Sequence, residues 1–159
     1  MSVSVQDFKQ ALGRFASGVT VVAVNDEGGQ RGMTASAFLS VSLDPPLVLV
    51  SVGKKAEMHA HLLAGARWSA SILRSDQAAL SGHFAGYGEA EVKWEGPPEG
   101  PPHLAGSLAW VECSPFAAHD AGDHTLFVGL VDAAGHNDGE PLLYSQGKYR
   151  DLVPLPRSG

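Results

Sequence analysis

The sequence contains one cysteine, Cys113, which excludes an intramolecular disulfide bond. Its longest apolar run, LVLVSV at residues 47–52, is much shorter than the ~20 residues that a membrane-spanning helix requires. The first ten residues, MSVSVQDFKQ, lack the basic start and the apolar stretch of a signal peptide. We therefore expect a cytoplasmic protein with no membrane as a partner.

Basic residues are scarce as well. The chain has 11 Lys and Arg against 17 Asp and Glu, a formal net charge of −6, and the bases are scattered except for Lys54–Lys55. Nucleic-acid binding needs a basic patch or stripe, so we expect no nucleic-acid partner. The pairs His59/His61 and His119/His124 have no cysteine or acidic set at metal-site spacing, so we expect no metal.

Two sequence motifs of common enzymes are missing too. No G-x-G-x-x-G follows a predicted strand, and the βαβ alternation of a Rossmann domain is absent. The stretch ASGVT has a serine before a glycine but not the G-x-S-x-G turn of hydrolases. A dinucleotide-binding Rossmann fold and a serine hydrolase are therefore both disfavoured.

What remains is a chain of 159 residues with 44% hydrophobic content, which suits one domain spanning 1–159. The periodicity predicts helices within 2–18, 56–65 and 75–86. It predicts strands at 19–25, 33–43, 47–52, 68–73, 107–116, 124–135 and 141–147, with 47–52 buried on both faces. The proline-rich stretch 87–106 is interpreted as a surface excursion. This pattern indicates a mainly antiparallel β fold, closed as a barrel or a sandwich.

The strand at 33–43 is unusually rich in small and hydroxylated residues. Thr34, Ala35 and Ser36 would let a flat ligand approach the backbone closely while offering hydrogen-bond donors. The alternative is an edge strand whose Ser and Thr side chains face water.

The segment 47–59, LVLVSVGKKAEMH, runs from an aliphatic strand into a helix. Ser51, Lys54 and Lys55 surround the expected helix start, where free amides and the helix dipole attract anions. A phosphate site fits this arrangement, and so does an ordinary loop with solvated lysines.

Four further residues have chemistry worth noting. His124 follows a Gly-Asp turn, and Asp123 can orient it, although histidines at turns are commonly just solvated. Tyr144 and Tyr149 flank a Gly-Lys turn, where a ring can stack on a ligand or a partner chain, or merely cover the core edge. Cys113 has no activating base nearby in sequence, so we interpret it as a small buried hydrophobic residue.

Taken together, five segments of the sequence resemble the flavin reductase family, in particular the small reductase components of two-component aromatic monooxygenases. The segments are FASGVTVV, GMTASAFLSVSLDPPLVLVSVGKKAEM, SILRSDQAALSGHFAG, AGDHTLFVGLV and PLLYSQGKY. The resemblance implies an FMN-binding split β-barrel, built as a homodimer. It implies transfer of a hydride from NAD(P)H to FMN or FAD, and delivery of the reduced flavin to an oxygenase component.

The resemblance also implies roles for individual residues. Thr34, Ala35 and Ser36 would line the flavin ring, and the ribityl chain and phosphate would meet Ser51, Val52, Lys55 and Ala56. His83 and Phe84 would lie near the flavin tail, and the nicotinamide dinucleotide would contact His124 and Tyr149. No catalytic acid, base or nucleophile is expected, because hydride transfer is carried out by the two cofactors.

Several choices stay open at this point. The stretch YGEAEVKWEG departs from the family pattern, which leaves FMN against FAD and NADH against NADPH undecided. A flavin-binding electron carrier of the flavoredoxin type, without a productive NAD(P)H site, is the first alternative. A β-barrel interaction module that binds no flavin is the second.

Overall fold

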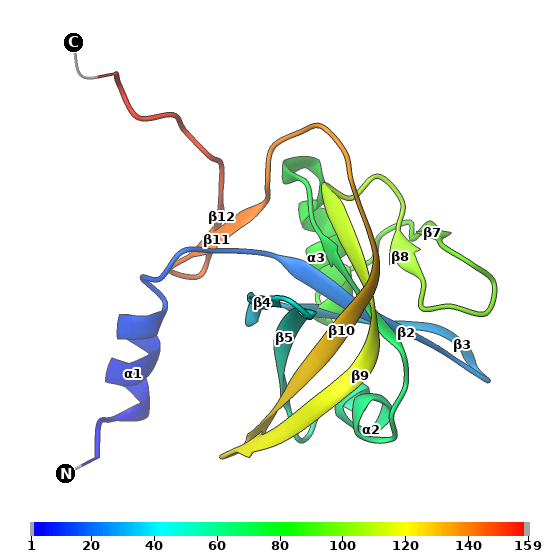
Figure 1. Cartoon of the computed structure of the whole chain (residues 1–159). Coiled ribbons are helices and arrows are strands. Elements are labelled where there is room, and N and C mark those ends of the chain that lie inside the picture. The colour runs from blue at the N-terminus through cyan, green and yellow to red at the C-terminus, as the bar shows by residue number, and fades with distance from the viewer. Residues whose placement is uncertain (1, 158–159) are drawn as a thin grey trace.

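The computed structural model describes residues 2–157, and most of its strands belong to one antiparallel sheet (Figure 1). The seven strands lie in the spatial order β3 (Gly29–Ala35), β2 (Thr20–Asp26), β6 (Trp68–Ile72), β9 (Ala109–Ala121), β10 (His124–His136), β5 (Pro46–Gly53) and β4 (Phe38–Leu43). The sheet curls into a barrel that is not closed, since β3 and β4 are its two unpaired ends. The prediction of a mainly antiparallel split barrel is confirmed.

Smaller elements are attached to this sheet. Three short strands form a second sheet in the order β1 (Ser17–Gly18), β11 (Leu143–Ser145) and β12 (Lys148–Arg150), and β7 (Trp94–Glu95) pairs with β8 (His103–Leu104). The helices are α1 (Val5–Leu12), α2 (Glu57–Leu63) and α3 (Ala78–Phe84), the last preceded by a 3-10 turn at Ser75–Gln77. The three expected helices are therefore present.

Two of the predicted strands need correction. The expected strand 33–43 is two strands, because Ser36 and Ala37 carry the chain from β3 at one end of the sheet to β4 at the other. The segment 47–52 is not buried on both faces: Val48, Val50 and Val52 point into the core, and the alternate residues are only half-buried. Alternation places successive side chains on opposite faces, and only one face of β5 is covered.

The proline-rich stretch is also more buried than predicted. Its second half, from Gly100 to Leu104, lies against the sheet and is buried. The Ser69 hydroxyl donates to the carbonyl oxygen of Pro102, and the Leu104 amide donates to the Ser71 hydroxyl at 2.9 Å. Serines on β6 therefore satisfy the backbone of this loop, which is what burial of a loop requires.

Helix α1 is different from the rest of the fold. Ser4 caps its N-terminus by accepting a hydrogen bond from the Asp7 amide at 3.0 Å, yet none of its residues is buried. It stands apart from the barrel, and the C-terminal segment also extends away (Figure 1). An isolated helix of eight residues is marginal in water, so its apolar face needs a covering surface.

The core offers a direct test of the barrel packing at Gly129. A Cβ atom added there would lie 2.6 Å from the Trp68 ring and 2.8 Å from the Cβ atom of Cys113, both of which are buried. Overpacking of this kind costs about 1–3 kcal/mol. We predict that Gly129→Ala lowers the free energy of unfolding by that amount in urea titrations.

A double variant serves as the control for this prediction. Trp68→Phe shrinks the ring that the new methyl group meets, so Gly129→Ala should cost less in a Trp68→Phe background than in the wild-type protein. Equal costs in the two backgrounds would show that β6 and β10 do not pack as described.

Candidate functional site

The gap between β3 and β4 leaves a small-residue edge open. Ala35 is buried in the core, Thr34 is half-buried and Ser36 is exposed. No strand within residues 2–157 pairs with the outer side of β3, so every second residue there presents unpaired main-chain groups. This edge is where the sequence predicted close approach of a flat ligand.

The Thr34 side chain is already committed to a hydrogen bond. Its hydroxyl donates to the Ser81 carbonyl oxygen at 2.7 Å. A hydroxyl has a single proton to donate, so the Thr34 side chain has only acceptor capacity left for a ligand. Any donor that a ligand meets at this residue must come from the main chain.

A cavity of about 560 Å³ adjoins this edge. Thr34 and Ser36 form one side of it, and Tyr144 and Tyr149 come from the small sheet on another side. The two tyrosine rings make an edge-to-face contact with centroids 5.6 Å apart. The structure thus brings the predicted Thr34, Ser36 and Tyr149 together around one space.

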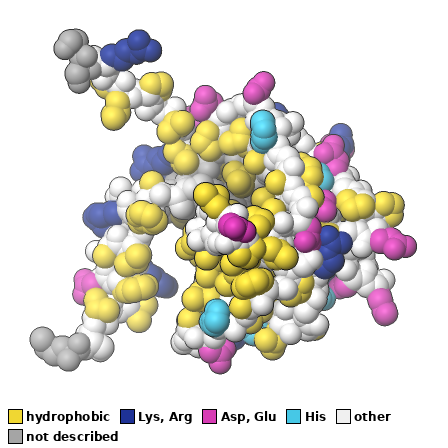
Figure 2. All heavy atoms as spheres, viewed as in Figure 1, with side chains coloured by type: hydrophobic (Ala, Val, Ile, Leu, Met, Phe, Trp, Pro, Cys, Tyr) yellow, Lys and Arg dark blue, Asp and Glu magenta, His cyan; other side chains and the backbone are white. Residues whose placement is uncertain are grey.

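A larger groove of about 820 Å³ lies on the outer face of β4, β5 and β10. It is lined by Ser17, Ser36, Ser51 and mostly apolar residues such as Phe15, Leu39 and Leu126. Ser36 lines both this groove and the 560 Å³ cavity, so the two spaces meet at the split. Figure 2 shows hydrophobic side chains gathered on this part of the body, facing α1.

His124 lies at one end of the same face. It pairs with Gly53 across β10 and β5. Because it is two residues from Leu126 on β10, its side chain lies on the same face of the sheet as Leu126, which lines the groove. A Cβ atom on Gly53 would be 3.7 Å from His124 Nε2, so the imidazole lies over this glycine. Asp123 Oδ1 is 2.8 Å from His124 Nδ1, and this hydrogen bond lowers the pKa of Asp123 below its ordinary value.

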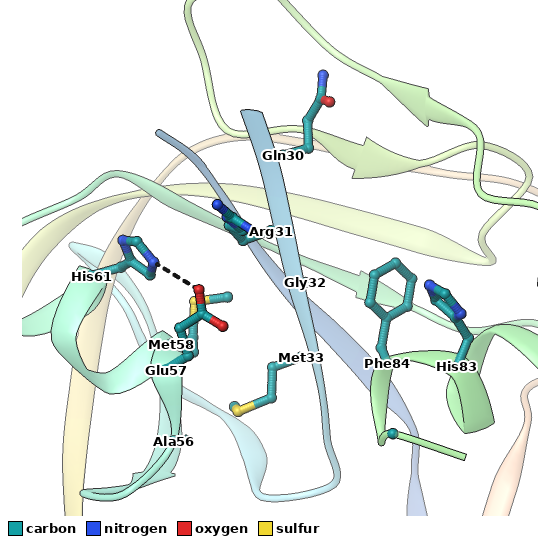
Figure 3. A pocket seen from close by; sticks show the side chains of 11 residues that line it. Gln30, Arg31, Gly32, Met33, Ala56, Glu57, Met58, His61, His83 and Phe84 are labelled. Atoms are coloured by element: carbon teal, nitrogen blue, oxygen red, sulfur yellow. Dashed lines mark ion pairs between the residues drawn. The ribbon is translucent and has the colours of Figure 1, made fainter. Parts of the chain in front are cut away.

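A third cavity, of about 400 Å³, lies between β3, α2 and α3 (Figure 3). His83 and Phe84 reach it from α3, Met33 from β3 and Ala56 from the start of α2. Phe84 covers Gly32, where an added Cβ would lie 2.6 Å from the ring, and its ring centroid is 5.5 Å from that of Trp94. His83 contributes a buried Nδ1 that has no hydrogen-bond partner within residues 2–157.

The remaining predicted residues are arranged less favourably for side-chain contacts. Val52 is 1% exposed and Ala35 is 8% exposed, so only their main chains can meet a ligand. Lys55 is exposed, whereas Lys54 pairs with Asp120 at 3.3 Å. Ala56 is the N-cap of α2 and makes no side-chain capping bond. A charged contact at this end of β5 therefore falls to Lys55.

Cys113 is no part of the site. It is fully buried in the main core cluster, and burial raises the pKa of its thiol to about 12. A thiol of that pKa has almost no thiolate near neutral pH, so it cannot act as a nucleophile.

Sequence reasoning missed one central residue, Ser81. It is 2% exposed, lines the 560 Å³ cavity and accepts a hydrogen bond from the Tyr149 hydroxyl at 2.8 Å. The motif SGHFAG contains it, but the family resemblance implied roles only for His83 and Phe84 in this motif. The available signal was a serine on the buried face of a short helix, but the sequence alone does not show which face of that helix is buried.

Comparison with known proteins finds flavin reductases. The model of the flavin reductase like domain matches residues 12–153. The chain is 45% identical over 146 residues to the FMN reductase (NADH) SmoA of Agrobacterium fabrum, covering 91% of this chain and 84% of that protein. It is 44% identical over 147 residues to the reductase component of 4-hydroxyphenylacetate 3-monooxygenase of Thermus thermophilus, covering 92% and 95% of the two chains.

A solved structure is similar over nearly the whole chain. The NADH:FAD oxidoreductase of Streptomyces globisporus, in complex with NAD and FAD fragments, superposes with a TM-score of 0.87 at 38% identity, covering 97% of this chain and 98% of that one. The family predicted from the five sequence segments is thereby confirmed, and the chain belongs to the flavin reductase like domain family.

Proposed function

We propose that the protein is an NADH:flavin oxidoreductase that accepts FMN or FAD and supplies reduced flavin to a monooxygenase partner. The observation that carries this proposal is the open edge at Thr34–Ser36, which borders a 560 Å³ cavity with two tyrosines on another side. NADH is the donor we favour, because the names of the relatives reported above that specify a nicotinamide donor specify NADH. Bound flavin and NADH supply the hydride chemistry themselves.

The chain's own residues then bind and orient. The β3 edge offers main-chain donors, and its small side chains let a flat ring approach the backbone closely. The Thr34 hydroxyl adds a hydrogen-bond acceptor. Ser51 and Lys55 suit the ribityl chain and phosphate, with main-chain groups at Val52 and Ala56. His83 and Phe84 border the 400 Å³ cavity that suits the flavin tail.

His124 and Tyr149 are the residues we assign to the nicotinamide dinucleotide. Asp123 holds the His124 ring through Nδ1, which leaves Nε2 available to the dinucleotide. Holding two reacting rings in register lowers the barrier through orientation, without an acid or a base. The carrier alternative has no use for these two residues.

We also propose that the protein is a homodimer of the cytoplasm. Within residues 2–157, α1 buries none of its own residues, and Phe8 and Phe15 are 54% and 81% exposed. The groove beside the split is apolar and of about 820 Å³. A second copy of the chain would cover both the helix and the groove with one symmetric interface, as most soluble oligomers do.

In the part of the chain that the structure describes, no helix is long and apolar enough to cross a bilayer.

The first test is NADH oxidation by the purified protein with and without added FMN or FAD. We expect oxidation only when flavin is present. His124→Ala should raise the KM for NADH about tenfold to a hundredfold while the Kd for flavin stays within twofold, because a lost hydrogen bond to a charged group costs about 1.5–3 kcal/mol.

The matched control for this variant is His119→Ala. His119 is exposed on the neighbouring strand of the same hairpin, opposite Leu126, and lines none of the three cavities. Its replacement should leave both constants unchanged. Flavin binding without any NADH oxidation would instead support the carrier alternative.

A second test concerns the dimer. Phe15→Glu puts a charge on the most exposed aromatic side chain of the groove, so sedimentation should show a dimer for the wild-type protein and a monomer for the variant. Phe116→Glu is the control, since Phe116 is 55% exposed but does not line the groove. A wild-type monomer, or dissociation by both variants alike, would contradict the proposed interface.

A further inference from the structure

Ser81 makes two separate polar contacts from one buried position on α3. Its hydroxyl accepts a hydrogen bond from the Tyr149 hydroxyl at 2.8 Å, and its carbonyl oxygen accepts one from the Thr34 hydroxyl at 2.7 Å. These partners are 68 and 47 residues away in sequence. A 2% exposed serine thus joins segments that are otherwise far apart in the chain.

The two partners belong to different sheets. Thr34 is on β3, at an end of the seven-stranded sheet, and Tyr149 is on β12, at an end of the three-stranded sheet. Both line the 560 Å³ cavity, together with Ser81 itself. Helix α3 therefore fixes the distance between two sides of the cavity: the flavin wall, formed by Thr34 and Ser36, and the tyrosine wall, formed by Tyr144 and Tyr149.

The hairpin of β11 and β12 that carries Tyr144 and Tyr149 needs support from the rest of the fold. Strands β11 and β12 have only three residues each, all residues of β12 are exposed, and the turn between them has Gln146 and Gly147 at φ of 52° and 76°. Short hairpins are at best marginally stable on their own. Within residues 2–157, the bond to Ser81 is the one hydrogen bond that the Tyr149 side chain makes.

We propose that Ser81 is a positioning residue for NADH, which acts by holding the Tyr149 ring through its hydroxyl. This inference rests on the proposed function and on the assignment of Tyr149 to the nicotinamide dinucleotide. Ser81→Ala removes the acceptor for Tyr149 but keeps the carbonyl oxygen that holds Thr34. The variant should therefore weaken the use of NADH and spare flavin binding.

The test is a double-mutant cycle with Ser81→Ala, Tyr149→Phe and the combined variant. Each single change should raise the KM for NADH about threefold to tenfold, the range expected for loss of one hydrogen bond. We expect kcat and the Kd for FMN to stay within twofold. The combined variant should be no worse than either single variant, because both remove the same bond.

Tyr144→Phe is the control for losing a phenol hydroxyl in the same aromatic pair. Within the described residues its hydroxyl has no hydrogen-bond partner, so its effect on KM should multiply with that of Ser81→Ala instead of merging with it. If Ser81→Ala and Tyr149→Phe also multiply, or if Tyr149→Phe leaves KM unchanged, the proposal is overturned. An unchanged KM in Tyr149→Phe overturns the proposal even if Ser81→Ala does not fold.

A readout on the protein without cofactors separates this inference from the proposed function. The chain has three tyrosines, so labelling the phenol carbon of tyrosine gives three NMR signals, and the one lost in Tyr149→Phe is Tyr149. Ser81→Ala should shift that signal and leave the Tyr87 signal in place. An unshifted Tyr149 signal overturns the positioning role, whereas a wild-type protein that never oxidises NADH overturns the function alone.

Discussion

The site depends on the failure of one sheet to close. Seven strands curl into a barrel, but its two terminal strands, β3 and β4, are consecutive in sequence and joined only by Ser36 and Ala37. Two residues would be enough for a hairpin turn, but β3 pairs with β2 and β4 pairs with β5, so the two strands diverge and each leaves an unpaired edge. Proteins usually protect such edges from other chains. Here the edge is kept open and lined with small residues, which suits a flat ligand.

Other features of the fold follow from that opening. The hydrogen bond from the Thr34 hydroxyl to the Ser81 carbonyl oxygen holds the β3 edge in place. It also leaves the Thr34 side chain able only to accept a hydrogen bond from a ligand. The outer faces of β4 and β5 stay apolar beside the split, which calls for a covering surface such as a second copy of the chain. Ser36 borders both spaces, so a ligand at the split would lie close to that cover.

The sequence predicted much of this arrangement and missed specific parts. Local periodicity was enough for the three helices and for β10 with His124 at its start, whereas the strand predicted at 107–116 continues to Ala121 as β9. It could not show that 33–43 is divided at Ser36–Ala37, because the break depends on which strands pair far along the chain. The burial of Gly100–Leu104 depends on serines some thirty residues away on β6, such as Ser69. Ser81 stayed hidden for the same reason, since its partners are remote in sequence.

In the proposed site, the flavin ring lies against the open β3 edge. Hydrogen–deuterium exchange of the backbone amides, with and without saturating FMN, tests it most directly, because exchange reports protection residue by residue. We predict slower exchange at 34–37 and 51–56, and no change at 62–66 and 115–118, which border a separate cavity. Protection confined to the latter segments, or none at 34–37, would contradict it.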